Sequence, residues 1–242
     1  MNLTIDTHSH TLASGHAYST VHEMILGAKE NGLSLLSITE HGIAMPGTCH
    51  EMYFHNLKVI PREQYGIKLL LGVEANIMDF EGTLDTYGYY VDELELVIAS
   101  LHMPCIKPGT LEENTNAYIG AMQNPHVNII GHPDDSKYPI DYERLVKAAK
   151  KYHVLLELNN SSLSPNSFRL NSRENAIQLL TLCKQYEVMI TVGSDAHVAN
   201  DAGNFCFVKE LLEFTQFPES LVINTDIERF QMWLEEHKAL RK

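Results

Sequence analysis

Short apolar runs alternate with longer segments of helical period along most of this 242-residue chain. The apolar runs are too short for typical core helices, and turn or charge signals bound them, which predicts strands. Seven runs are predicted as strands: residues 3–6, 33–39, 67–73, 94–100, 127–131, 154–158 and 189–193.

Segments of helical period follow most of these strands. They are predicted as helices over residues 19–31, 114–123, 141–152, 172–186, 205–214 and 226–240, the first with a capped start from Thr20 to Glu23. Residues 46–62 are predicted to form a helix over the mouth of the fold, and an extra hairpin or flap is predicted within 76–90. Strands joined by crossover helices are parallel, which predicts an α/β fold. Because no repeat or long linker divides the chain, residues 1–242 are predicted to form one domain.

Side chains of the types that bind metals follow the predicted strands. His8 and His10 come after the first strand and, two residues apart, point to the same face. The later strand ends carry, in chain order, Glu40 with His41, Glu74, His102, His132, Asn159 with Asn160, and Asp195 with His197. Since the carboxyl ends of parallel strands meet at one rim, we expect these side chains to converge there.

The ligand types narrow the choice of metal. Imidazole and carboxylate without thiolate suit Zn, Mn or Fe(II) better than Ca or Mg alone. The candidate ligands are His8, His10, His16, His41, Glu74, His102, His132, Asp195 and His197. They exceed the roughly four ligands of one zinc ion, so a multinuclear site is predicted, with Glu74 as a bridging carboxylate. Glu40 directly precedes a ligand and points to the other side of its strand, which favours a supporting role.

Composition and charge limit the partners. With 44% hydrophobic and 20% charged residues, the chain has the composition of a soluble globular protein. Its net charge of −13 argues against nucleic acid or an acidic membrane as a partner. Bound divalent ions would nevertheless make the pocket locally positive and attract a phosphate. Neither a leader peptide nor a membrane-spanning stretch is recognised, so a cytoplasmic location is predicted.

The motifs HSH, TEH, GVE, SLH, GHP and SDAH, in this order at the strand ends, resemble the PHP (polymerase and histidinol phosphatase) family. The phrases ASGHAYST, GVEANI, LELNNSS and VGSDAH are most similar to its YcdX-like branch of small bacterial phosphatases. The resemblance covers essentially the whole chain. It implies a distorted (β/α)7 barrel, similar to a TIM barrel, that holds three divalent ions, usually zinc.

The resemblance also implies a ligand set for each ion. The first set is His8, His10, Glu74 and Asp195; the second is Glu74, His102 and His132; the third is His16, His41 and His197. The chain has Glu40 where the family often has Asp, which could shift an orienting hydrogen bond but leaves the ligands intact.

The family implies phosphoester hydrolysis, most simply of a small phosphorylated substrate by a phosphomonoesterase. A hydroxide shared by two ions is the expected nucleophile, with Glu74, His102, His132 and Asp195 as the catalytic centre. Arg169 in the loop after strand six is expected to grip phosphate, with Arg173 as its competitor. Asn159 is a second candidate for binding substrate.

Three alternatives stay open at this point. A phosphodiesterase or nuclease of the same family would share the site, and an amidohydrolase would share the initial HxH pattern. A metal store without activity is a third reading, and it would not need a pocket with room for water. Family members of this shape are often oligomeric, so a homo-oligomer also stays open.

Overall fold

The computed structural model describes residues 1–86 and 91–240, and within them seven parallel strands form the central sheet. In sheet order they are β1 (Ile5–Asp6), β2 (Leu35–His41), β4 (Ile67–Asn76), β5 (Leu96–Ser100), β6 (Ile129–Ile130), β7 (Leu155–Asn159) and β8 (Ile190–Gly193). A parallel bridge between Ser9 and Ala196 joins the ends of β1 and β8. The sheet is thus a nearly closed barrel, which confirms the predicted distorted (β/α)7 architecture.

Two strands run further than their apolar pattern predicted. β2 and β4 pair in parallel as far as His41 opposite Glu74, so these polar residues lie within strands and not after them. The apolar pattern that predicts a strand ends at the first polar residue. Backbone pairing of β2 with β4 continues beyond it, because the polar side chains there find partners in the fold. A short antiparallel strand, β3 (Glu63–Gln64), pairs with β4 and was not predicted. An antiparallel bridge between Ile77 and Leu84 confirms a hairpin in 76–90, although 87–90 lie outside the described residues.

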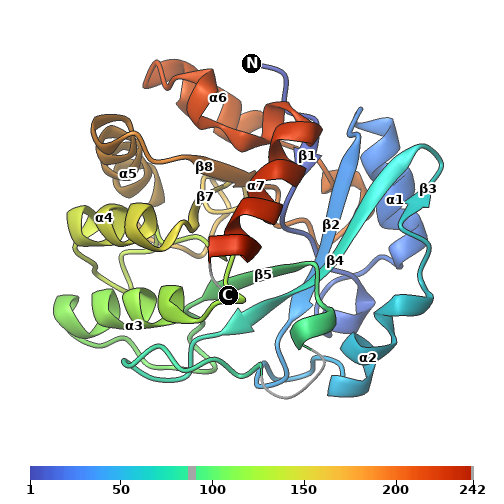
Figure 1. Cartoon of the computed structure of the whole chain (residues 1–242), viewed down its shortest axis with the longest axis horizontal. Coiled ribbons are helices and arrows are strands. Elements are labelled where there is room, and N and C mark those ends of the chain that lie inside the picture. The colour runs from blue at the N-terminus through green and yellow to red at the C-terminus, as the bar shows by residue number, and fades with distance from the viewer. Residues whose placement is uncertain (87–90, 241–242) are drawn as a thin grey trace.

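Helices connect the strands and cover the barrel. They are α1 (Val21–Glu30), α2 (Glu51–Asn56), α3 (Leu111–Gln123), α4 (Tyr142–Tyr152), α5 (Ser172–Tyr186), α6 (Cys206–Phe214) and α7 (Ile227–Leu240). In Figure 1, α3, α4 and α5 stack along one side of the sheet and α1 lies on the other. α3 begins three residues earlier than predicted because Thr110 and Glu113 form a capping box like that of Thr20 and Glu23. α2 is shorter than the segment predicted.

Within residues 1–86 and 91–240, no helix combines the length and apolar character that crossing a bilayer requires.

The interior of the barrel changes from apolar to polar along its axis. At the amino-terminal ends of the strands, Ile5, Leu35 and Leu155 pack into a buried cluster. Phe230 and Trp233 of α7 belong to the same cluster and close that end of the barrel. The apolar packing leaves the carboxyl ends as the place where polar groups can gather.

Asn224 fastens the first and last strands together. Its buried side chain donates hydrogen bonds to the carbonyls of Ile5 and Val192 and accepts one from the Val192 amide at 2.7 Å. One amide side chain therefore spans the seam between β1 and β8, where direct strand pairing is short.

Candidate metal centre

The nine predicted ligand side chains converge at the carboxyl ends of the strands, although the sequence spreads them from residue 8 to residue 197. Glu74 lies at their centre. Its Oε1 atom is 2.8 Å from Nε2 of His132 and 3.2 Å from Nε2 of His102. Its Oε2 atom lies 2.7 Å from an imidazole nitrogen of His41, 3.4 Å from one of His8 and 3.5 Å from one of His10. Each carboxylate oxygen thus faces different imidazoles, the geometry that a bridging ligand requires.

A second carboxylate reaches the pair of histidines after β1. Oδ1 of Asp195 lies 3.4 Å from Nε2 of His10 and 3.8 Å from Nε2 of His8, and these two nitrogens are 3.1 Å apart. His8, His10, Glu74 and Asp195 therefore meet in one place, the set that the family resemblance implies for the first ion.

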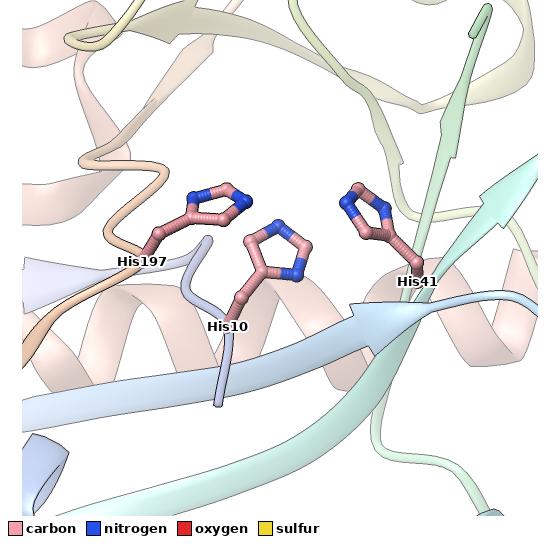
Figure 2. Close-up of side chains that lie close together, drawn as sticks. All are labelled: His10, His41 and His197. Carbon is pink, nitrogen blue, oxygen red and sulfur yellow. The ribbon is translucent and has the colours of Figure 1, made fainter. Parts of the chain in front are cut away.

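The remaining histidines surround the outer part of the cluster. Nε2 of His16 is 3.2 Å from Nε2 of His41, and the ring centroids of His16 and His197 are 4.9 Å apart. Figure 2 shows the rings of His10, His41 and His197 turned toward one another from three separate segments. Ligand atoms of these three residues lie within 4.8 Å of one another. His10 consequently lies between the first and third sets.

Hydrogen bonds outside the cluster fix how its imidazoles present their nitrogens. Nδ1 of His8 donates to the Glu157 carboxylate at 2.8 Å. Nδ1 of His10 donates to Ser14 Oγ at 3.0 Å, because the Ser14 hydroxyl itself donates to Glu40 at 2.6 Å. Carboxylates and hydroxyls behind metal-ligating histidines typically hold this tautomer. Each Nε2 is then directed into the cluster.

His102 is oriented in the same way. Its Nδ1 lies 2.7 Å from Oδ1 of Asn76, and the Asn76 amide is fixed because its Nδ2 donates to Asp85 at 2.6 Å. Since Oδ1 only accepts, Nδ1 of His102 carries a proton, and this hydrogen bond directs Nε2 toward Oε1 of Glu74.

Several polar atoms of the cluster lie close together without satisfying one another, and their arrangement fits bound cations. Nε2 of His8 and Nε2 of His10 both face the cluster and lie 3.1 Å apart, close enough for one cation to be held by both. Among the described residues, Nδ1 of His41 and Oε2 of Glu74 are buried without a hydrogen-bond partner, although only 2.7 Å separates them. Buried polar atoms are rarely left in this state, and divalent ions would satisfy them.

The charges of the cluster are strongly coupled. Burial raises the pKa of Glu74, but His102, His8 and His41 outweigh it and hold that pKa well below its usual range. Burial lowers the pKa of His8, yet the carboxylates of Glu157, Glu74 and Asp195 raise it well above the usual value. Burial, His41 and His197 hold the pKa of His10 well below its usual value, so without metal Glu74 stays ionised and the proton lies on His8 rather than on His10.

Backbone geometry at two candidate ligands is unusual. His132 has a φ of 29° and Asp195 a φ of 55°, a region that side-chain-bearing residues rarely adopt and that clusters at functional sites. Glu157 stabilises the first by accepting the His132 amide at 2.7 Å, and the Asp195 amide donates to the His8 carbonyl at 2.9 Å. At Gly193, a Cβ would lie 2.1 Å from Glu157 Oε1, so only glycine leaves room for this carboxylate.

Arg169 lies inside the site, whereas its predicted competitor does not. The Arg169 guanidinium is buried and donates from both terminal nitrogens to Oδ2 of Asp195 at 3.1 Å. Arg173 pairs with Glu210 at 3.1 Å on an exposed surface. Arg169 thus leaves Oδ1 of Asp195 to face the histidines.

Asn159 and Asn160 point in different directions, as the alternation of a strand requires. Nδ2 of the fully buried Asn159 donates to Glu157 and to Asp195, and its Oδ1 accepts from the Ser162 amide. Asn160 accepts the Phe207 amide at 3.0 Å in the first turn of α6. The hydrogen bonds of Asn159 therefore favour a positioning role, and its predicted contact with substrate stays a prediction.

A cavity of about 630 Å³ opens onto the cluster. Its lining includes His16, His41, His102, His132, Asp195, His197 and Arg169. Cavities of this size accommodate small molecules. The arrangement can hold several cations beside a space in which an anionic ligand would contact them.

The residues that support the ligands, chiefly Glu157, Ser14 and Asn76, were not among the predicted site residues. A signal for Glu157 was present, because it lies two residues before Asn159 in β7 and so shares its inward face. Asn76 carried the same signal, because it lies two residues after Glu74 in β4, whereas the contact of Ser14 with Glu40 joins residues 26 positions apart.

A parallel barrel with imidazoles and carboxylates gathered at the carboxyl ends of its strands is the arrangement of metal-dependent barrel enzymes. The family model for the PHP domain matches residues 6–223, and the chain belongs to this family.

Curated relatives align over almost the entire chain. A protein named probable phosphatase from Clostridium novyi is 45% identical over 241 residues, which are 100% of this chain and 98% of the relative. Another probable phosphatase, from Caldicellulosiruptor saccharolyticus, is 46% identical over 237 residues, 98% of each chain. Among solved structures, a histidinol phosphate phosphatase from Lactococcus lactis, complexed with zinc, L-histidinol and phosphate, superposes with a TM-score of 0.61 at 19% identity, covering 89% of this chain and 94% of that one. At this identity the likeness concerns the fold.

Proposed function

We propose that this PHP-family phosphatase is a metal-dependent phosphomonoesterase whose site takes three divalent ions, zinc in the first place and Mn or Fe as alternatives. The observation that carries the proposal is the convergence of nine ligand-type side chains beside one cavity. The names of the curated relatives support phosphatase activity. The zinc and phosphate bound by the Lactococcus lactis enzyme support the choice of metal and ligand.

The ligand sets implied by family resemblance are retained. His8, His10, Glu74 and Asp195 would hold one ion; Glu74, His102 and His132 a second; His16, His41 and His197 a third. When bound, such ions supply positive charge for phosphoryl oxygens and lower the pKa of water toward neutrality.

The chain's own residues prepare this chemistry by fixing the ligands. Glu157 and Ser14 keep the Nε2 atoms of His8 and His10 directed inward. Arg169 engages Oδ2 of Asp195 and, because it lines the cavity, is also proposed to contact the phosphate. Such preorganisation reduces the reorganisation needed when charge develops on the phosphoryl group.

The substrate is proposed to be a small phosphorylated molecule bound within one domain spanning residues 1–242. A cavity of about 630 Å³ accommodates such a molecule. The net charge of −13 favours it over nucleic acid.

The proposal is tested by assaying the zinc-loaded and manganese-loaded protein side by side on a phosphomonoester, a phosphodiester, single-stranded DNA and an acylated amine. We expect hydrolysis of the monoester to dominate and to disappear after chelation. Preferential cleavage of the diester or DNA, or of the amide, would replace the phosphomonoesterase assignment with a nuclease or an amidohydrolase.

A further inference from the structure

The cavity beside the ligand cluster is lined by two chemically different sets of side chains. One set is the cluster itself. The other, which we call the apolar wall, consists of Met45, Pro46, Leu101, Met103, Pro104 and Phe168. Met103 and Phe168 are 49% and 70% exposed, so part of this wall is open to solvent. Large apolar side chains at a cavity mouth are more often binding surfaces than packing residues.

Phe168 is held in place at the rim. Nζ of Lys137 donates to the Phe168 carbonyl at 2.7 Å and lies 4.9 Å from the centre of its ring. The guanidinium carbon of Arg169 lies 5.3 Å from the same ring. The adjoining Leu170 amide donates to Asp135 at 3.0 Å. The ring is therefore positioned before any ligand arrives, which lowers the entropic cost of binding.

Two polar side chains that line the cavity beside the apolar wall, Asp135 and Tyr138, already bond to the protein. Oδ1 of Asp135 accepts the amides of Lys137 and Leu170, both at 3.0 Å. The hydroxyl of Tyr138 donates to the Ile106 carbonyl at 2.6 Å. A polyhydroxylated ligand would lose water at this wall without gaining equivalent hydrogen bonds, whereas a flat apolar group would lose little.

We propose that the apolar wall binds the leaving alcohol of the substrate, and that this alcohol is an aromatic or similarly apolar group and not a sugar. The inference rests on the proposed phosphomonoesterase function. The phosphoryl group would face the ligand cluster while the ring contacts Met103 and Phe168. Specificity then comes from burial of apolar surface on a preformed wall.

The test compares benzyl phosphate with glycerol phosphate on the metal-loaded protein. We expect a KM for benzyl phosphate about tenfold below that for glycerol phosphate, the size of effect that one apolar contact surface gives. Phe168→Ser and Met103→Ser should raise the benzyl phosphate KM several-fold more than they raise the glycerol phosphate KM. Phe214→Ser is the matched control, because Phe214 is 65% exposed and lies outside the cavity. The centre of its ring is 5.4 Å from the guanidinium carbon of Arg173, as the Phe168 ring is close to Arg169.

A binding experiment separates this inference from the proposed activity. By calorimetry, benzylphosphonate should bind more tightly than methylphosphonate, and Phe168→Ser should remove the difference. Equal binding of the two phosphonates, or a benzyl phosphate KM that Phe168→Ser does not change, would overturn the inference even if monoesters are hydrolysed. If neither ester is hydrolysed, the proposed function fails. A retained preference for benzylphosphonate would still support binding of an aromatic group at the apolar wall.

Discussion

Oε2 of Glu74 lies 2.7 Å from Nδ1 of His41, and within the described part of the chain neither atom has a hydrogen-bond partner. Both atoms are buried between neighbouring strands whose register places the two residues side by side. Burying polar atoms without hydrogen bonds costs folding free energy, because they lose their contacts with water. A cation bound here would satisfy both atoms, which supports the proposed metal site.

Glu74→Gln should abolish most metal binding and activity, because the amide keeps the size of the side chain but loses the charge shared among the ions. We expect kcat to fall by more than about 100-fold, beyond the loss typical of supporting residues. Metal per chain, measured by elemental analysis, and kcat check this together. The exposed Glu210→Gln serves as the control, and wild-type metal content in Glu74→Gln would contradict the central role of Glu74.

Protein purified without added metal should carry about three equivalents of metal, and His102→Ala should lose one of them with most of the activity. His102 contributes one Nε2 beside Glu74 Oε1, so its removal opens one ligand set and leaves the others. His22→Ala, an exposed histidine outside the cluster, is the control. A single equivalent in the wild type would refute three ions, and full turnover in His102→Ala would exclude this ligand.

Arg169→Ala should raise the KM for a phosphomonoester, by about tenfold or more if the guanidinium grips phosphate. Arg173→Ala, whose partner is the exposed Glu210, should leave KM unchanged. Steady-state kinetics at saturating metal distinguishes the two. If Arg169→Ala loses metal but keeps its KM, the arginine only positions Asp195.

Gly193→Ala should disturb the site although glycine offers no functional group. The added Cβ would lie 2.1 Å from Glu157 Oε1 and 2.6 Å from the Cβ of His8, so the carboxylate that orients this histidine must move. We expect lower metal affinity, by about 10- to 100-fold, as for other changes behind a ligand. Metal titration of the stripped protein measures it, and an unchanged affinity would show that Glu157 can relocate freely.

Asn224→Ala should destabilise the fold by about 3 kcal/mol, because buried backbone groups of Ile5 and Val192 lose their partners. Urea denaturation followed by circular dichroism gives the free energy of unfolding. Asn200→Ala, at an exposed position, is the matched control and should change it little. Equal stability of the two variants would mean that the seam between β1 and β8 closes without this clamp.

The alternation of apolar runs and helical segments predicted a parallel α/β fold, and the family resemblance implied that it closes into a barrel. The polar residues at the strand ends predicted which side chains would gather. Both are local properties: apolar runs must be buried, and parallel strands place their carboxyl ends together. His8 and Asp195 could therefore be predicted as neighbours. The sequence could not show how far β2 and β4 continue, because their final residues are polar and pair only through partners on other strands.

Only the tertiary structure decided which groups support the ligands. Glu157 accepts hydrogen bonds from both His8 and the His132 amide. Ser14 accepts one from His10 and donates one to Glu40. These contacts join residues up to 149 positions apart, and their geometry depends on how the strands tilt and where the loops return. The donor–acceptor distance of a hydrogen bond can vary by only a few tenths of an ångström. A pattern along the chain does not specify positions that precisely.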